Sequence, residues 1–187
     1  MRLRQLEAEL GSRIELVWKS YLLRPEATER RDLEKFRVYT QGWARPAGEA
    51  DGGTFRVWAS DAGPPSHSIP PHTVARAAAE LGRSAFDAIH ESLFRAYFAD
   101  NRDITSEDTL RAIWSECALP PPAFERAHAA DVRDGVLADH REATELGVHG
   151  VPAVRIEPNP VATVGAHATE VYRRWFLKRL GEDRRAP

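Results

Sequence analysis

The chain has 187 residues, of which 42% are apolar and 29% charged, so it is long and apolar enough for one ordinary globular domain. Its 26 basic and 28 acidic side chains nearly balance and form no long block of one sign, so we expect no nucleic-acid partner. No stretch approaches the ~20 continuous apolar residues that cross a bilayer, and the first residues have no apolar signal region, so we expect no membrane span and a cytoplasmic location.

The N-terminal part of the sequence predicts a helix followed by a buried strand. Leucines recur at helical spacing over residues 2–10, and Gly11 can end that helix in left-handed geometry. Residues 14–23 (IELVWKSYLL) are rich in β-branched and aromatic side chains, which predicts a strand covered on both faces. Residues 33–43 carry another helical stripe, whereas most of 44–71 is typical of a loop.

The middle of the chain, residues 70–147, has the apolar spacing of helices almost throughout. Glycines and a run of three prolines divide it into about four helices. Thr105 and Asp108 have a spacing that resembles a capping box, which predicts Thr105 as an N-cap. Cys117 is the only cysteine, so no internal disulfide can form, and its place on an apolar helix face predicts a buried structural thiol.

The C-terminal part returns to strand patterns. Residues 151–156 and 161–165 are short apolar runs on either side of the Glu-Pro-Asn-Pro turn at 157–160, which predicts a β-hairpin. Apolar residues at helical spacing from Val171 to Leu180 predict a closing helix.

Several segments match a known family. Residues 150–154 (GVPAV) match a loop that contains a cis proline, and 164–166 (VGA) match the segment leading into the final helix. Residues 86–98 (FDAIHESLFRAYF), followed by 103–105 (DIT), match a helical insert. With the order of the elements, these segments make the chain similar to DsbA-like thioredoxin-fold proteins. The branch concerned includes FrnE-type oxidoreductases, 2-hydroxychromene-2-carboxylate isomerases and kappa-class glutathione transferases, and the resemblance covers essentially the whole chain.

The resemblance implies an α/β fold of thioredoxin-like type with an inserted helical subdomain. We expect one domain over residues 1–187. Residues 1–60 and 148–187 would form the thioredoxin-like layer, and residues 61–147 would form the helical insertion.

The resemblance also implies a thiol–disulfide oxidoreductase. Family members carry a Cys-x-x-Cys, or in the isomerase branch a Ser-bearing motif, after a first strand and at the N-terminus of the first helix. The printed sequence begins inside that helix and has neither motif there. Disulfide exchange needs one thiol to attack and a second to resolve the mixed disulfide, so we expect this chain to be inactive as printed and the reactive segment to lie upstream.

Two alternatives stay open. The chain could be a peptide-binding thioredoxin-fold module without a dithiol, or a glutathione-dependent isomerase or transferase of the same fold. In all cases the expected partners are disulfide- or thiol-containing peptides or small molecules, with no resident cofactor. The oligomeric state is not predicted.

Four residues are candidates for substrate binding. Pro152 could simply open a strand, but the resemblance favours a cis Val151–Pro152 bond in a substrate loop. His72 falls where the isomerase branch has a histidine that lines the site, and His67 stands where that branch has an asparagine. No cysteine or acidic side chain accompanies these histidines in the run, so we expect no metal site.

Overall fold

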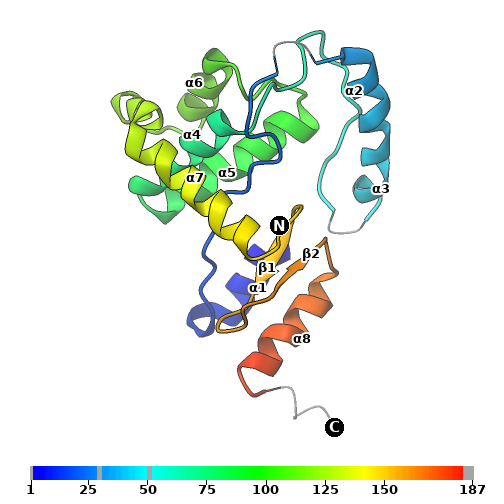
Figure 1. Ribbon diagram of the computed structural model, residues 1–187, viewed down its shortest axis with the longest axis vertical. Coiled ribbons are helices and arrows are strands. Elements are labelled where there is room, and N and C mark those ends of the chain that lie inside the picture. Colours follow the sequence, from blue (N-terminus) through cyan, green and yellow to red (C-terminus); the bar gives the residue numbers. More distant parts are fainter. Residues whose placement is uncertain (1, 29–30, 50–51, 183–187) are drawn as a thin grey trace. The chain divides into compact units, whose positions relative to one another are not determined.

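The computed structural model describes residues 2–28, 31–49 and 52–182. The chain forms two compact units (Figure 1). The terminal unit combines Met1–Tyr21 with Arg141–Pro187, and the central unit is Leu22–His140. None of the helices in the described part of the chain is long and apolar enough to span a membrane.

The terminal unit packs two helices and a hairpin around a small core. Its elements are α1 (Arg2–Leu10), a 3₁₀ turn η1 (Gly11–Arg13), β1 (Ala153–Arg155), β2 (Ala162–Val164) and α8 (Thr169–Arg179). The buried residues of this core cluster come from the two helices and are Leu6, Leu10, Tyr172 and Phe176. Charge pairing supports this packing, since Arg173 on α8 donates to Glu9 on α1 at 2.7 Å. The predicted first and last helices are both confirmed.

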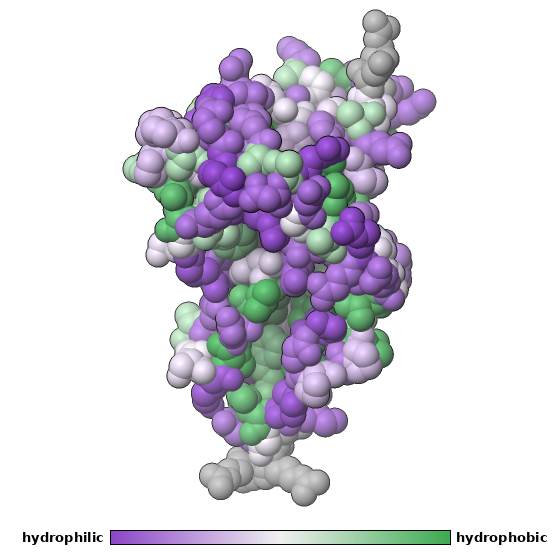
Figure 2. Space-filling view, turned by 60° about the vertical axis from the view of Figure 1, so that its left-hand side comes forward, coloured by the Kyte–Doolittle hydropathy of each residue, from purple (hydrophilic) through white to green (hydrophobic). Residues whose placement is uncertain are grey.

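The core of the terminal unit is only partly covered. Six apolar side chains that pack against it are only partly buried: Leu3, Ile14, Val154, Ile156, Trp175 and Leu177. In Figure 2, apolar surface shows between hydrophilic flanks in the lower part of the view, over the terminal unit.

The predicted hairpin is confirmed in a shorter form. β1 and β2 pair antiparallel, with Ala153 opposite Val164 and Arg155 opposite Ala162. They are the only sheet within the described ranges. Gly165 N–H donates to the carbonyl oxygen of Pro152 at 2.8 Å, which extends the ladder by one pair.

The prediction of a strand over residues 14–23 is wrong. The backbone is extended at Ile14, but residues 14–23 form no strand in the structure. Burial alternates along this segment, and Val17 is 68% exposed, so only one face is covered. The β-branched and aromatic composition favoured an extended backbone, but a strand also requires a hydrogen-bonded neighbour, and no described residue provides one.

The central unit contains the other helices. The first group is α2 (Leu33–Thr40), the 3₁₀ turn η2 (Gln41–Trp43) and α3 (Ala44–Ala47). The second group is α4 (Ile69–Glu80), α5 (Arg83–Phe94), the π-helical turn η3 (Arg95–Ala99), α6 (Glu107–Glu116), the 3₁₀ segment η4 (Pro121–His128) and α7 (Ala130–Glu145), which continues into the terminal unit. The predicted set of about four helices in this region corresponds to α4–α7.

The main core of the central unit forms around α4. Alanines at 75, 77 and 78 make one face of α4 small, so α5 and η4 approach it closely. Trp114 and Phe124 fill the remaining space in an edge-to-face pair with ring centroids 5.6 Å apart.

A second, aromatic core joins α2 to the rest of the central unit. Phe36, Trp43 and Trp58 are buried there, with Tyr97 and Phe98 packed against them. Residues 22–60, which the sequence predicts as part of the thioredoxin-like layer, lie in the central unit of the structure, because these rings pack against Tyr97 and Phe98 of η3.

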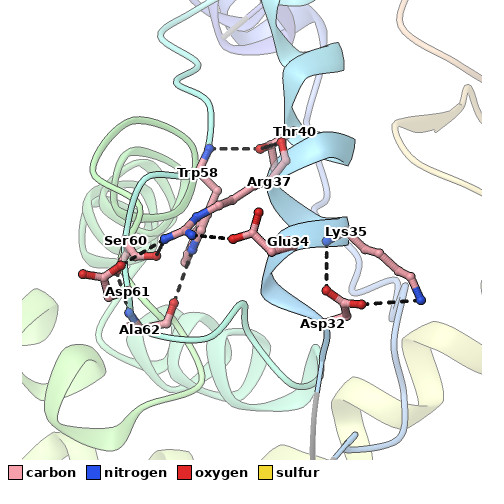
Figure 3. Close-up of polar contacts among 9 residues, drawn as sticks. All are labelled: Asp32, Glu34, Lys35, Arg37, Thr40, Trp58, Ser60, Asp61 and Ala62. Atoms are coloured by element: carbon pink, nitrogen blue, oxygen red, sulfur yellow. Dashed lines mark hydrogen bonds and ion pairs between the residues drawn. The ribbon is translucent and has the colours of Figure 1, made fainter.

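The chain after residue 57 is fixed to α2 by polar contacts (Figure 3). Thr40 Oγ1 accepts from the backbone N–H of Trp58 at 2.9 Å, and both groups are buried. Arg37 donates to Asp61 at 3.0 Å, and Asp32 caps α2 by accepting from Lys35 N–H at 3.0 Å.

Candidate functional site

The loop before β1 is the first candidate site. The Val151–Pro152 peptide bond is cis, as predicted, and a second cis bond at Glu157–Pro158 in the hairpin turn was not predicted. Val151 is 48% exposed, so the loop presents an apolar side chain and its backbone to the surface.

The outer edge of β1 continues this loop. Because Pro152 and Gly165 form a hydrogen-bonded pair, the ladder alternates, and the next hydrogen-bonded pair is Val154 with Thr163. The N–H and C=O groups of Ala153 and Arg155 therefore point away from β2. β2 is the one strand that pairs with β1 among the described residues, so within them the outward edge of β1 has no paired strand.

Sequence reasoning did not single out Ala153 and Arg155 as functional residues. The residue types carry no signal, because the groups that matter are backbone groups. The register of the predicted hairpin could have identified them.

His67 lies in the segment that leads into α4. Its Nδ1 and the Ser66 hydroxyl form a hydrogen bond of 2.8 Å. The ring is partly buried, and Ser66 N–H donates to Thr105 Oγ1 at 3.4 Å. Ser66 therefore contacts both Thr105, just before α6, and the His67 ring.

His72 lies on α4 and is neutral near pH 7. Burial lowers its pKa from 6.5 to about 4, with the nearby His140 acting in the same direction and the Asp139 carboxylate against it. A neutral, inward-packed imidazole of this kind is not poised to transfer protons near neutral pH. Within residues 2–28, 31–49 and 52–182, no group of three or more His, Cys, Asp or Glu side chains could hold a metal ion.

The four predicted site residues fall in different units. Val151 and Pro152 belong to the terminal unit, and His67 and His72 to the central unit. A single substrate site formed by all four therefore stays a prediction.

Cys117 is at the C-terminal end of α6. It is partly buried against the main core, and its thiol donates to the Ser92 hydroxyl at 3.3 Å. The predicted packing on an apolar face is confirmed, whereas the thiol is partly and not fully buried. No second thiol exists in the chain to resolve a mixed disulfide.

Comparison with known proteins identifies the fold. A model of the DSBA-like thioredoxin domain family matches residues 1–174. A solved structure from Nitrosomonas europaea, provisionally described as a protein disulfide isomerase, is 15% identical, with a TM-score of 0.76 over 98% of this chain and 89% of that one. The cytosolic disulfide reductase DsbM from Pseudomonas aeruginosa is 18% identical, with a TM-score of 0.72 over 99% and 91% of the two chains.

No curated protein matches the sequence. The two structural likenesses establish the fold alone, because their identities are low. They confirm the predicted thioredoxin-like fold with a large helical part. Since the family model spans nearly all of the described residues, the chain belongs to the family of DSBA-like thioredoxin domains.

Proposed function

We propose that this member of a thiol–disulfide oxidoreductase family holds extended thiol- or disulfide-containing peptides at the Val151–Pro152 loop, and that the printed 187 residues do not catalyse dithiol exchange. The observation that carries the binding role is the edge of β1. Its outward N–H and C=O groups at Ala153 and Arg155 follow directly on an exposed loop.

The binding step follows from strand pairing. A peptide aligned with β1 would exchange backbone hydrogen bonds with Ala153 and Arg155, and these bonds do not depend on the peptide sequence. Val151 would add apolar contact at one end. Such a site suits substrates that are recognised by their extended backbone.

The absence of exchange follows from the cysteine count. In dithiol exchange, an attacking thiolate bonds to one substrate sulfur and releases the other as a thiol. A second protein thiol then displaces the first substrate sulfur, which leaves a protein disulfide. Cys117 is the single thiol of the chain, and it is partly buried and donates a hydrogen bond to the Ser92 hydroxyl. The chain therefore has neither an accessible thiolate for the attack nor a second thiol for the resolving step.

A binding experiment with the full chain tests the first part. Ala153 is the first residue of β1, where proline is tolerated, and Ala153→Pro removes an outward N–H without touching the ladder to β2. We expect a fluorescent extended peptide to bind the wild type in an anisotropy titration and to lose about tenfold or more in affinity to Ala153→Pro.

The matched control is Ala153→Val, which keeps the N–H and should retain the wild-type affinity. Absence of peptide binding by the folded wild type, or equal binding by Ala153→Pro, would refute the binding role.

An exchange assay tests the second part. We expect the chain to give no turnover of a model disulfide with a dithiol reductant beyond the uncatalysed rate. Turnover that disappears in Cys117→Ser would show that Cys117 is catalytic and would refute the proposal. Turnover of an electrophile that requires added glutathione would instead support the isomerase or transferase alternative.

A further inference from the structure

An arginine of the central unit is held in an unusual environment just before α2. Arg31 is partly buried, and its guanidinium carbon lies 4.5 Å from the centroid of the Phe36 ring. Its Nη1 donates to the carbonyl oxygen of Pro65 at 2.7 Å. The side chain is therefore fixed by a stacking contact and by one hydrogen bond, and most of its donor N–H groups are not used by these contacts.

Among the residues that the structure describes, Arg31 has no carboxylate partner, whereas several other partly buried arginines do have one. Arg37, Arg102 and Arg173 each pair with a carboxylate at 3.0 Å or less. Counting only residues that the structure describes, no carboxylate pairs with Arg31 or with Arg24. A guanidinium that is removed from water without a counter-charge is costly, and an anion would offset that cost.

A second arginine, Arg24, is held by residues 65–68, the segment that also binds Arg31. The backbone of Arg24 exchanges two hydrogen bonds with Ser68: Ser68 N–H donates to Arg24 O at 2.8 Å, and Arg24 N–H donates to Ser68 Oγ at 3.0 Å. Since Arg31 is bound to Pro65, residues 65–68 hold both arginines in place. The side chain of Arg24 is exposed, so its charge stays accessible.

One tyrosine, Tyr97, completes the surroundings of the two arginines. Burial lowers the pKa of Arg31, and the positive charge of Arg24 lowers it further, so the two guanidinium groups are close enough to repel each other. Burial raises the pKa of Tyr97 to about 12, although both arginines oppose that change. Tyr97 therefore keeps its hydroxyl proton at neutral pH and can donate it.

The ring of Tyr97 is fixed by aromatic packing. Its centroid lies 5.3 Å from that of Trp43 and 5.8 Å from that of Trp58. In the described ranges its hydroxyl has no hydrogen-bond partner. A rigid donor beside two positive groups is preorganised for an acceptor with negative charge.

We propose that Arg24, Arg31 and Tyr97 form a binding site for a small oxyanion, a carboxylate or a phosphate group. Arg31 would use its remaining N–H groups in a fork that matches two oxygens, Tyr97 would donate a hydrogen bond, and Arg24 would add charge from the exposed side. The site needs neither a thiol nor the Pro152 loop, so it stands apart from the proposed function.

Arginine modification tests this site on the intact chain. Phenylglyoxal labelling, quantified by peptide mass spectrometry, follows each arginine separately. We expect inorganic phosphate or acetate, at an ionic strength kept constant with sodium chloride, to slow labelling of Arg24 and Arg31 about fivefold or more. Exposed Arg45 on α3 serves as the reference and should not change.

The two probes separate the two sources of the oxyanion. Protection by phosphate alone assigns a phosphate group, and protection by acetate alone assigns a carboxylate. Equal slowing at Arg24, Arg31 and Arg45, or no slowing at any of them, would overturn the proposal.

Substitutions provide a second measurement. Phosphate affinity, followed by tryptophan fluorescence, should fall about tenfold in Arg31→Gln and about threefold in Tyr97→Phe, which keeps the ring and loses only the hydroxyl. Arg45→Gln makes the same charge change outside the site and should bind as the wild type does. If Arg31→Gln does not fold, Tyr97→Phe and the exposed Arg24→Gln decide, and wild-type affinity in both would contradict the site.

Discussion

The guanidinium of Arg76, on α4, reaches the Asp139 carboxylate on α7 at 3.1 Å by passing directly over Gly135. A Cβ atom at position 135 would lie 2.4 Å from the guanidinium carbon. Asp139 is only 8% exposed, whereas the Arg76 side chain is 41% exposed, so the pair connects two helices through a buried carboxylate and a partly solvated guanidinium. The glycine in the middle of α7 is therefore explained by the passage of the arginine.

This relationship predicts a change of sign for one substitution. Gly135→Ala should destabilise the wild type by about 1 kcal/mol, because displacing Arg76 from Asp139 costs about 2 kcal/mol and better helix propensity returns about 1 kcal/mol. In an Arg76→Ala background the same substitution should stabilise by about 1 kcal/mol. Urea unfolding of the four proteins measures both values, and the same sign in both backgrounds would disprove this reading.

His72 predicts a pH dependence of stability. Its pKa is about 4 in the folded chain against an ordinary value of 6.5, so between these values the unfolded chain binds more protons. The contribution of His72 to the free energy of unfolding is therefore fully present above about pH 6.5. This contribution, up to roughly 3 kcal/mol, is lost as the pH falls through 4.

The comparison with His72→Gln isolates this effect from Asp139, His140 and the other titratable groups. Urea unfolding at pH 4.5 and at pH 7 should show a larger difference in the wild type than in His72→Gln. The control His128→Gln removes an exposed histidine of the same unit and should behave as the wild type does. Identical pH profiles for His72→Gln and the wild type would show that His72 titrates normally.

The buried hydrogen bond between Trp58 N–H and the Thr40 hydroxyl predicts a loss of stability when that hydroxyl is removed. Thr40→Val keeps the shape of the side chain but leaves the buried N–H of Trp58 without its acceptor, which should cost about 1–3 kcal/mol. Thr40→Ser keeps the hydroxyl and should cost less. Thermal or urea unfolding checks both, and an equal cost for the two substitutions would mean that the hydrogen bond shown in Figure 3 contributes little.

The placement of Cys117 predicts that its thiol reacts slowly with alkylating agents in the folded chain. Because its thiol is partly buried and bonded to Ser92, alkylation of the folded chain should be about tenfold slower than alkylation in denaturant. Cys117→Ala should lower the free energy of unfolding by about 1 kcal/mol. A thiol that reacts equally fast in both states would place Cys117 at the surface.

The sequence allowed most helices and the hairpin to be predicted, because local patterns determine them. Apolar spacing indicated α1 and α8, and the Pro-rich turn at 157–160 indicated the hairpin. The strand expected at 14–23 failed because pairing depends on a neighbour that no local pattern shows. The cap of α6 was misplaced by one residue: Ser106 accepts from Thr109 N–H, whereas Thr105 bonds to Asp103.

The candidate sites were less visible in the sequence. The Val151–Pro152 loop was found through a family resemblance, whereas the groups beside it on β1 are backbone groups with no sequence signal. Arg24 and Arg31 were missed because nearly all basic residues of this chain are arginines. What distinguishes Arg31 is a partly buried guanidinium that no carboxylate of the described residues pairs with, which only the tertiary structure reveals.

Amide hydrogen exchange at the edge of β1 tests the central claim most directly. The N–H groups of Ala153 and Arg155 point away from β2, whereas Val154 N–H is already bonded to Thr163. Addition of a saturating extended peptide should slow exchange at Ala153 and Arg155 by about tenfold or more and leave Val154 much less affected. Bound peptide with unchanged exchange at Ala153 and Arg155 would contradict the account.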